Sequence, residues 1–306
     1  MAPAKLAIGV EIMNTRARIA LLPDGRRLHL QDGPIDLIIE AFGSKREVQS
    51  AYTAAASRFV SILDELCSEL PLLRQAAGPE GSRLSGVVAR KMLDAVLPYA
   101  ADNFITPMAA VAGAVAEEIL IAMTAAADLA RAYVNDGGDI ALHMDSSEEF
   151  QIGMVERPDR PSLFGTAKLC GSDPVRGIAT SGWRGRSFSL GIADAVTVLA
   201  ESASAADAAA TIIANAVDLP GHPAITRVPA CEIAPDSDLG TRPVTQHVGN
   251  LSHEEIALAL DFGVSTARNL LGRRLICAAA LHLQGETRVV GSSRLKLVSS
   301  RSLAHA

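Results

Sequence analysis

The sequence predicts a mixed α/β protein of the α+β class, in one domain over residues 1–306. Segments with helical period alternate with short apolar runs bounded by glycine or proline, so we expect both helices and strands. A chain of 306 residues can bury a large core. Aromatic residues make up 4% of it and hydrophobic residues 49%. We therefore expect a core of Ala, Val, Leu and Ile, in which helices pack closely on a sheet.

The first part of the chain predicts strands followed by helices. Residues 6–42 read as short strands, with a hairpin turn at Asp24-Gly25. Ser44 and Glu47 have the spacing of a capping box and open a helix. The helices expected in this part span about 44–70 (ahead of Pro71), 84–99 and 107–132.

The second part predicts short strands and two further helices. Ser252 and Glu255 have capping-box spacing and open the second of these helices. Because helices followed by strands occur in both parts, we expect duplicated halves over about 1–132 and 133–290, with a partly disordered tail over 291–306. The first helix spans 202–216, and 219–249 is expected to be mostly irregular. The expected strands span 132–144, 148–155, 164–171, 176–182, 194–200, 275–284 and 287–291.

Charge and composition exclude several classes of protein. A net charge of -6 would repel a phosphate backbone, which argues against nucleic-acid binding. The four cysteines form no C-x-x-C pair, so we expect free thiols and neither a zinc site nor disulfides. The N-terminus lacks a secretory h-region, and the apolar run 107–130 contains Glu117, Glu118 and Asp128. We expect a buried helix there, no membrane span, and a cytoplasmic protein.

Asp207 and Thr211 form a candidate metal site. They lie four residues apart on the helix expected over 202–216, so their side chains share one face. A carboxylate and a hydroxyl are hard oxygen ligands suited to Mg²⁺. The alternative is structural: Ser204 and Asp207 have capping-box-like spacing, and an acid in a first helical turn favours the helix dipole.

Two glycine-containing turns are candidate nucleotide contacts. The run Asn135, Asp136, Gly137, Gly138, Asp139 is either an ordinary hairpin turn or a backbone nest that a nucleotide can approach closely. Thr180, Ser181 and Gly182 end a short strand, followed by Trp183, Arg184 and Arg186. This second group is either an anion cradle with a tryptophan that stacks on a flavin or adenine ring, or a turn with solvated arginines.

Three stretches together resemble the superfamily of FAD:protein FMN transferases of the ApbE type. They are AAVAGAVAEEIL followed by YVNDGGDIAL, then RGIATSGW, then AVTVLAESASAADAAATIIA, within residues 105–217. The resemblance implies antiparallel-rich sheets covered by helices, and it implies bound Mg²⁺ and FAD. It assigns the metal to Asp207, Thr211 and the backbone carbonyl of Ala110. It assigns the flavin nucleotide to Asn135, Gly137, Gly138, Asp139, Thr180, Ser181 and Gly182.

The chain departs from the family's pattern after Gly182. Established transferases carry H-x-x-D-P-x-T-G there, whereas this chain has WRGRSFSLGIAD, in which Asp194 is the only acid. No catalytic residue can be singled out.

Two functions follow: a magnesium-dependent FAD-binding enzyme that transfers FMN or cleaves the FAD pyrophosphate, or a non-catalytic flavin-binding or accessory protein for a redox enzyme. A different phosphorylated or carboxylated substrate on the same fold is a third. The expected partners are a flavin nucleotide and a cytosolic acceptor or redox protein. The oligomeric state stays open, a homodimer included.

Overall fold

A nine-stranded sheet forms the centre of the protein. The computed structural model describes residues 16–78, 83–155, 163–291 and 295–297. All neighbouring strands in this sheet are antiparallel. In spatial order they are β1 (Arg18–Leu21), β2 (Leu28–Asp32), β3 (Ile35–Phe42), β4 (Arg131–Asp136), β5 (Asp139–Met144), β8 (Gly177–Ser181), β9 (Ala195–Ala200), β12 (Ala278–Leu283) and β13 (Glu286–Gly291).

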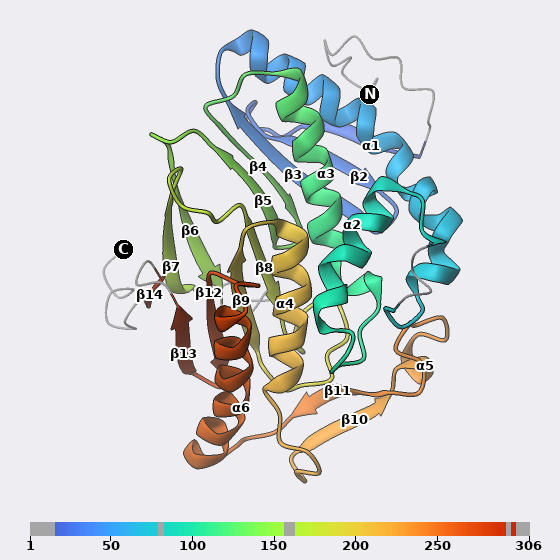
Figure 1. Ribbon diagram of the computed structural model, residues 1–306, viewed down its shortest axis with the longest axis vertical. Coiled ribbons are helices and arrows are strands. Elements are labelled where there is room, and N and C mark those ends of the chain that lie inside the picture. The colour runs from blue at the N-terminus through green and yellow to red at the C-terminus, as the bar shows by residue number, and fades with distance from the viewer. Residues whose placement is uncertain (1–15, 79–82, 156–162, 292–294, 298–306) are drawn as a thin grey trace.

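Helices cover one face of this sheet (Figure 1). The strands alternate as expected: in β4 the side chains of Ala132 and Val134 are buried toward the helices, while Tyr133 faces the opposite side. The sequence therefore correctly predicts the α+β class, with antiparallel sheets and covering helices. The helices are α1 (Lys45–Leu73), α2 (Val87–Val96), α3 (Val111–Ala126), α4 (Ala203–Ala216), α6 (His253–Gly272), the short α5 (Ala230–Ile233) and the 3₁₀ turns η2 (Leu97–Tyr99) and η3 (Pro107–Ala110).

Two smaller sheets complete the described fold. The strands β6 (Glu149–Val155), β7 (Leu163–Cys170) and β14 (Leu295–Leu297) form a three-stranded sheet. Side chains of β6 and β7 pack with those of β5, β8 and β9 in a second apolar cluster. The strands β10 (Ile225–Pro229) and β11 (Pro243–Val248) pair as a ribbon. The stretch 219–249 contains irregular segments, as expected, but it also contains these two strands and α5. Proline and glycine at the ends of β10 and β11 obscure the two short strands in the sequence.

The helix boundaries correct several details. Ser44 caps α1 as predicted, since its hydroxyl accepts from Glu47 N at 3.3 Å. The second bond of a capping box, from Ser44 N to the Glu47 carboxylate, is wrongly predicted, because this carboxylate accepts from Asp128 N at 3.0 Å instead. The helix runs through Pro71 in its last turn. The helix expected over 107–132 ends at Ala126, and the chain enters β4 at Arg131, where it pairs with β3.

The predicted division into halves stays a prediction. The β3–β4 pairing joins residues on both sides of that boundary in one continuous sheet. The expected strands before residue 16 lie outside the described residues, and so does most of the tail over 291–306. The four cysteines are free thiols, as predicted.

The apolar segment Pro107–Ala126 is an internal helix. Within the described residues it alone is long and apolar enough to cross a membrane by length and composition. It packs against α1, α2, α4, β4 and β5, and Glu118 pairs with Arg58 at 2.8 Å. This agrees with the sequence prediction of a buried helix.

Candidate functional site

Asp207 lies on α4 and contacts the N-terminus of α3. Its Oδ2 accepts a hydrogen bond from Gly113 N at 3.0 Å. Ala110 occupies the N-cap of α3 and has no side-chain acceptor of its own. Asp207 therefore supplies, from a neighbouring helix, the acceptor that Ala110 lacks.

The structural alternative for Asp207, a capping-box-like pairing with Ser204 at the start of its own helix, is wrong. The N-cap of α4 is Ser202, whose hydroxyl accepts from Ala205 N at 3.2 Å. Ser204 instead donates to the carboxylate of Glu117 at 2.9 Å. Asp207 thus caps α3 rather than its own helix.

A close contact between the backbones of α3 and α4 brings the three proposed metal ligands into one region. At Gly113 a Cβ would overlap the carbonyl oxygen of Ala203, so only glycine permits this approach. The 3₁₀ turn that ends at Ala110 also packs on α4. Thr211 lies one turn beyond Asp207, and its hydroxyl makes no hydrogen bond with any described residue.

Asp207 shares its surroundings with two further carboxylates at the β4–β5 turn. Asp136 is 8% exposed, and burial raises its pKa to about 7. Burial, followed by repulsion from Asp207, raises the pKa of Asp139 well above its ordinary value. Burial also raises the pKa of Asp207 to about 7, and Asp136 adds to this shift. The three acids thus repel one another in surroundings that disfavour negative charge.

The turn between β4 and β5 is a hairpin, as one of the two interpretations predicted. Gly137 and Gly138 adopt φ values of 63° and 118°, which suit glycine. Asn135 Oδ1 accepts from Gly138 N at 2.8 Å and closes the turn. Arg186 lies beside it, since a Cβ on Gly137 would be 3.4 Å from Arg186 Nη1. A hydrogen bond from the Asp36 backbone, and then the charge of Arg186, favour the ionised form of Asp136 and oppose the effect of burial on its pKa.

The end of β8 joins this region through its backbone. Thr180 N donates to Asp139 Oδ1 at 3.2 Å. The Thr180 hydroxyl pairs with that of Thr197 at 2.9 Å on the face away from the helices, while alternation places Ser181 on the helix-covered face. A Cβ on Gly182 would be 2.5 Å from Asp194 O. Close packing against this backbone is therefore sufficient to explain why residue 182 is a glycine.

The segment after Gly182 is fixed by Asp194, which is 6% exposed. This carboxylate accepts from Trp183 Nε1 at 3.1 Å, from Arg184 Nε at 2.6 Å and from Gln284 N at 2.7 Å. The Arg184 guanidinium stacks 4.2 Å from the Trp183 ring centroid. One face of the predicted stacking ring is therefore occupied by Arg184. The predicted cradle of two arginines is not assembled, because Arg184 is bound to Asp194 while Arg186 lies at the glycine turn.

The sequence analysis names Asp136 as part of the glycine turn but does not foresee it as a buried acid near Asp207. The alternation of side chains along β4 would have indicated this, since Asp136 follows Ala132 and Val134 on the helix-covered face. Within the described ranges, no three His, Cys, Asp or Glu side chains are placed to hold a metal ion together. The proposed metal ligands are not such a group of three side chains, since they combine one carboxylate, one hydroxyl and one backbone carbonyl.

The structure thus defines an α+β protein with an antiparallel sheet covered by helices on one face, in which a carboxylate on α4 is set against the N-terminus of α3. The chain belongs to the family described as AbpE bacteria, which matches residues 19–289.

The chain also resembles archaeal proteins named UPF0280. It is 38% identical over 183 residues to the UPF0280 protein of Methanopyrus kandleri, which covers 59% of this chain and 69% of that protein. It is 39% identical over 121 residues to that of Methanosphaerula palustris, covering 36% and 46% of the two chains. It is 41% identical over 112 residues to that of Archaeoglobus fulgidus, covering 36% and 44%. The chain thus spans less than half the length of the latter two relatives.

Proposed function

We propose that the protein binds FAD together with Mg²⁺, and that it resembles the FAD:protein FMN transferases in transferring FMN or cleaving the FAD pyrophosphate. Asp207, Thr211 and the Ala110 carbonyl would hold the metal. The observation that carries this proposal is the position of Asp207, which meets the N-terminus of α3 next to Ala110.

The donor set fits magnesium. Mg²⁺ takes hard oxygen ligands, binds few protein groups directly and keeps water and substrate phosphate in its shell. One carboxylate, a free hydroxyl and a carbonyl match that preference. A divalent cation would also offset the repulsion among Asp136, Asp139 and Asp207.

The glycine turn and β8 would hold the nucleotide. Gly137 and Gly138 expose backbone without side chains, and Arg186 beside them can neutralise a phosphate. Asn135 and Asp139 fix the shape of the turn and its contact with Thr180, while Ser181 and Gly182 continue toward the helix-covered face. Bound Mg²⁺ would polarise the pyrophosphate. The bond between the FMN phosphorus and the bridging oxygen would break, and AMP would leave with that oxygen. The FMN phosphorus would form a new bond to the oxygen of water or of an acceptor hydroxyl, which would release its proton.

Calorimetry and product analysis test this proposal. Purified protein should bind FAD more tightly with Mg²⁺ than with EDTA, and turnover should release AMP. Asp207→Asn should remove the magnesium dependence while keeping the acceptor for Gly113 N. If FAD does not bind with or without Mg²⁺, the proposal is wrong.

A non-catalytic flavin-binding or accessory protein is the second candidate. The interval after Gly182 lacks the H-x-x-D-P-x-T-G segment, and its one acid, Asp194, is engaged by three hydrogen bonds that fix the loop. Flavin absorbance in the purified protein without AMP release would favour this candidate. In both cases we propose a cytoplasmic protein whose partners are a flavin nucleotide and a cytosolic acceptor or redox protein.

A further inference from the structure

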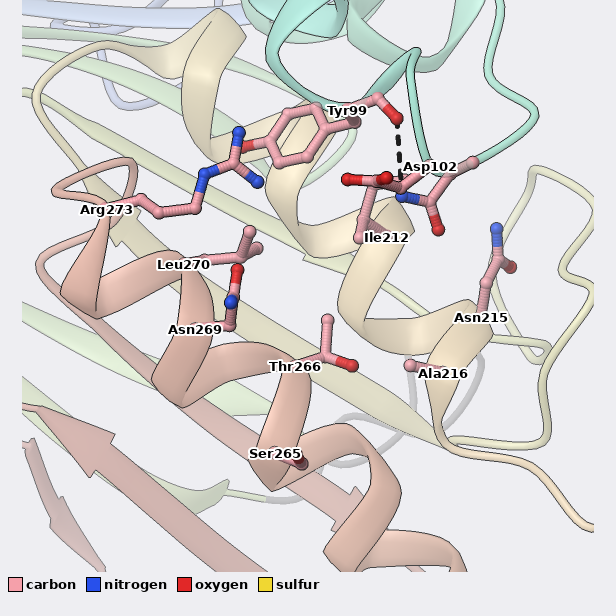
Figure 2. Close-up of a pocket in the computed structure, with 11 residues that line it drawn as sticks. Tyr99, Asp102, Ile212, Asn215, Ala216, Ser265, Thr266, Asn269, Leu270 and Arg273 are labelled. Atoms are coloured by element: carbon pink, nitrogen blue, oxygen red, sulfur yellow. Dashed lines mark hydrogen bonds between the residues drawn. The ribbon is translucent and has the colours of Figure 1, made fainter.

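A polar cavity lies at the C-terminal ends of α4 and α6, apart from the proposed flavin site. Its volume is about 360 Å³, and η2 and the residues after it form the third side (Figure 2). None of the residues proposed to hold metal or flavin lines it. Of the α4 residues that line it, Ile212 directly follows Thr211 in the sequence, and Asn215 lies eight residues beyond Asp207, about 12 Å along the helix axis.

Tyr99 points an unpaired hydroxyl into this cavity. The residue is 2% exposed, yet its hydroxyl makes no hydrogen bond with any residue that the structure describes. In Figure 2 the ring lies along the cavity with its hydroxyl end toward Arg273. The hydroxyl oxygen itself is not enclosed by protein, since the fully buried side-chain atoms without a partner in the described residues belong to Arg131, Arg227, Thr245 and Glu286. It therefore faces the open cavity, where a bound molecule can reach it.

Arg273 supplies positive charge beside that hydroxyl. Its Nη2 donates to Pro98 O at 2.6 Å, which leaves most of its N–H groups for another acceptor. It forms no ion pair within the described part of the chain. Its charge reaches Tyr99, since it opposes the burial that raises the pKa of that phenol to about 12. Tyr99 therefore stays protonated at neutral pH and can donate to an anion.

Asp102 supplies a negative charge in the same cavity. It lines the cavity with Arg273, but the two side chains do not form an ion pair. Two opposite, unpaired charges favour a ligand that carries complementary groups at its two ends. Asp102 would repel a second negative charge, which disfavours inorganic phosphate and dicarboxylates.

We propose that this cavity binds a small organic acid with one carboxylate and one ammonium or hydroxyl group. Arg273 and Tyr99 bind the carboxylate, and Asp102 accepts from the group at the other end. Along the α6 wall Asn269 adds an amide, and Thr266, whose hydroxyl donates to Phe262 O at 3.2 Å, adds an acceptor. The cavity lies at the lower end of the size range of small-molecule sites, which suits a metabolite smaller than a nucleotide. This inference goes beyond the proposed flavin function and does not depend on it.

Calorimetry with defined probes tests the proposal. L-serine and L-threonine represent the amino acids, D-glycerate and L-lactate the hydroxy acids, and inorganic phosphate and glycerol are the controls. At least one of the four acids should bind with a Kd below about 1 mM, and neither control should bind comparably. Preference between the two pairs of acids would identify the second group as ammonium or hydroxyl.

Three variants locate the binding. Arg273→Gln should weaken it at least about tenfold, since a charge-assisted bond is lost. Arg274→Gln, a change in the adjacent residue that does not line the cavity, should leave it unchanged. Tyr99→Phe should weaken binding about three- to tenfold without lowering the melting temperature, because the hydroxyl it removes has no partner in the fold.

Several outcomes would overturn the proposal. It is wrong if none of the four acids binds, or if binding is the same in Arg273→Gln and Tyr99→Phe as in the original protein. It is also wrong if FAD displaces the acid, or if Asp207→Asn abolishes binding, since the cavity would then belong to the flavin site. Failure of FAD binding alone would leave this site unaffected, so the two proposals fail separately.

Discussion

Asp207 combines two roles that different substitutions can separate. Its carboxylate accepts from the N-terminus of α3, and it is also our proposed magnesium ligand. Asn keeps the oxygen acceptor and loses the charge, whereas Ala loses both.

We expect Asp207→Ala to lower the free energy of unfolding by about 1 kcal/mol, the usual effect of losing a helix cap. Asp207→Asn should be at least as stable as the original protein, because it keeps the cap and removes one of three repelling charges. Both variants should lose the stabilisation that Mg²⁺ and FAD give, measured as the rise in melting temperature on adding them. Equal instability of both variants would contradict the capping role.

The site is only partly predictable from the sequence, for physical reasons. The i, i+4 spacing correctly places Asp207 and Thr211 along one helix, and Asp-Gly-Gly-Asp correctly predicts a tight turn. Spacing within one helix says nothing of a second helix, so the contact with Gly113 could not be foreseen. Alternation likewise places the Thr180 hydroxyl on the face away from the helices, which the motif alone does not reveal.

At the scale of single elements, the C-terminus of α6 carries a local strain. Leu275 N bonds to Leu270 O and Arg274 N to Leu271 O, the pattern of a Schellman motif. Arg274 occupies its left-handed position with φ of 60°, where glycine is the favoured residue.

Arg274→Gly should therefore raise the free energy of unfolding by about 0.5–1 kcal/mol. The control is Arg268→Gly, an exposed position inside the same helix, which should lower it by about 1 kcal/mol. Denaturant titration measures both. A loss of stability in Arg274→Gly would show that the arginine side chain outweighs the backbone strain.

The N-terminus of α6 should confer a pH dependence on stability. Ser252 N donates to Glu255 at 2.7 Å and His222 lies 2.8 Å from the same carboxylate. The bond from the Ser252 backbone, then the one to His222, lowers the pKa of Glu255 from 4.5 to about 2. A lowered pKa in the folded state means that the stabilisation is complete above pH 4.5 and is lost as the pH falls toward 2.

Glu255→Gln should accordingly lower the melting temperature at pH 7, and the difference from the original protein should shrink between pH 4.5 and 2. Glu254→Gln changes a neighbouring acid of the same helix turn and should have a smaller, less pH-dependent effect. Thermal unfolding across this range measures both variants. A difference that does not change with pH would contradict the assignment to Glu255.

At the scale of elements the sequence is more informative than at the site. Most helices and strands follow their periodicity, and both serine caps that open α1 and α6 are correctly predicted. The failures lie where tertiary pairing decides: β10 and β11 are short and bounded by proline, and the end of α3 depends on the pairing of β4 with β3.

For the whole molecule, the close contact of α3 with α4 is one of the contacts that join the early helices to the later part of the chain. It depends on Gly113, where a side chain would meet the backbone of Ala203. Gly113→Ala should lower the free energy of unfolding by about 1–3 kcal/mol, the usual effect of overpacking.

Gly272→Ala provides a matched helical control for this prediction. A Cβ there meets nothing within 4 Å, so the substitution should be neutral or stabilising by up to about 1 kcal/mol. Unfolding by denaturant compares the two variants. If both behave alike, the helix contact is not tight.

The order of strands in the central sheet bears on how the chain folds. Hairpins such as β4–β5 and β12–β13 join strands that are close in sequence, whereas β3–β4 and β9–β12 join strands separated by whole helices. Closing those long loops loses more chain entropy before any contact forms. In pulsed hydrogen exchange we expect the amides of the local hairpins to gain protection first. Those between β3 and β4 and between β9 and β12 should follow, which makes the docking of α1–α3 and of α4–α6 the slow step of folding.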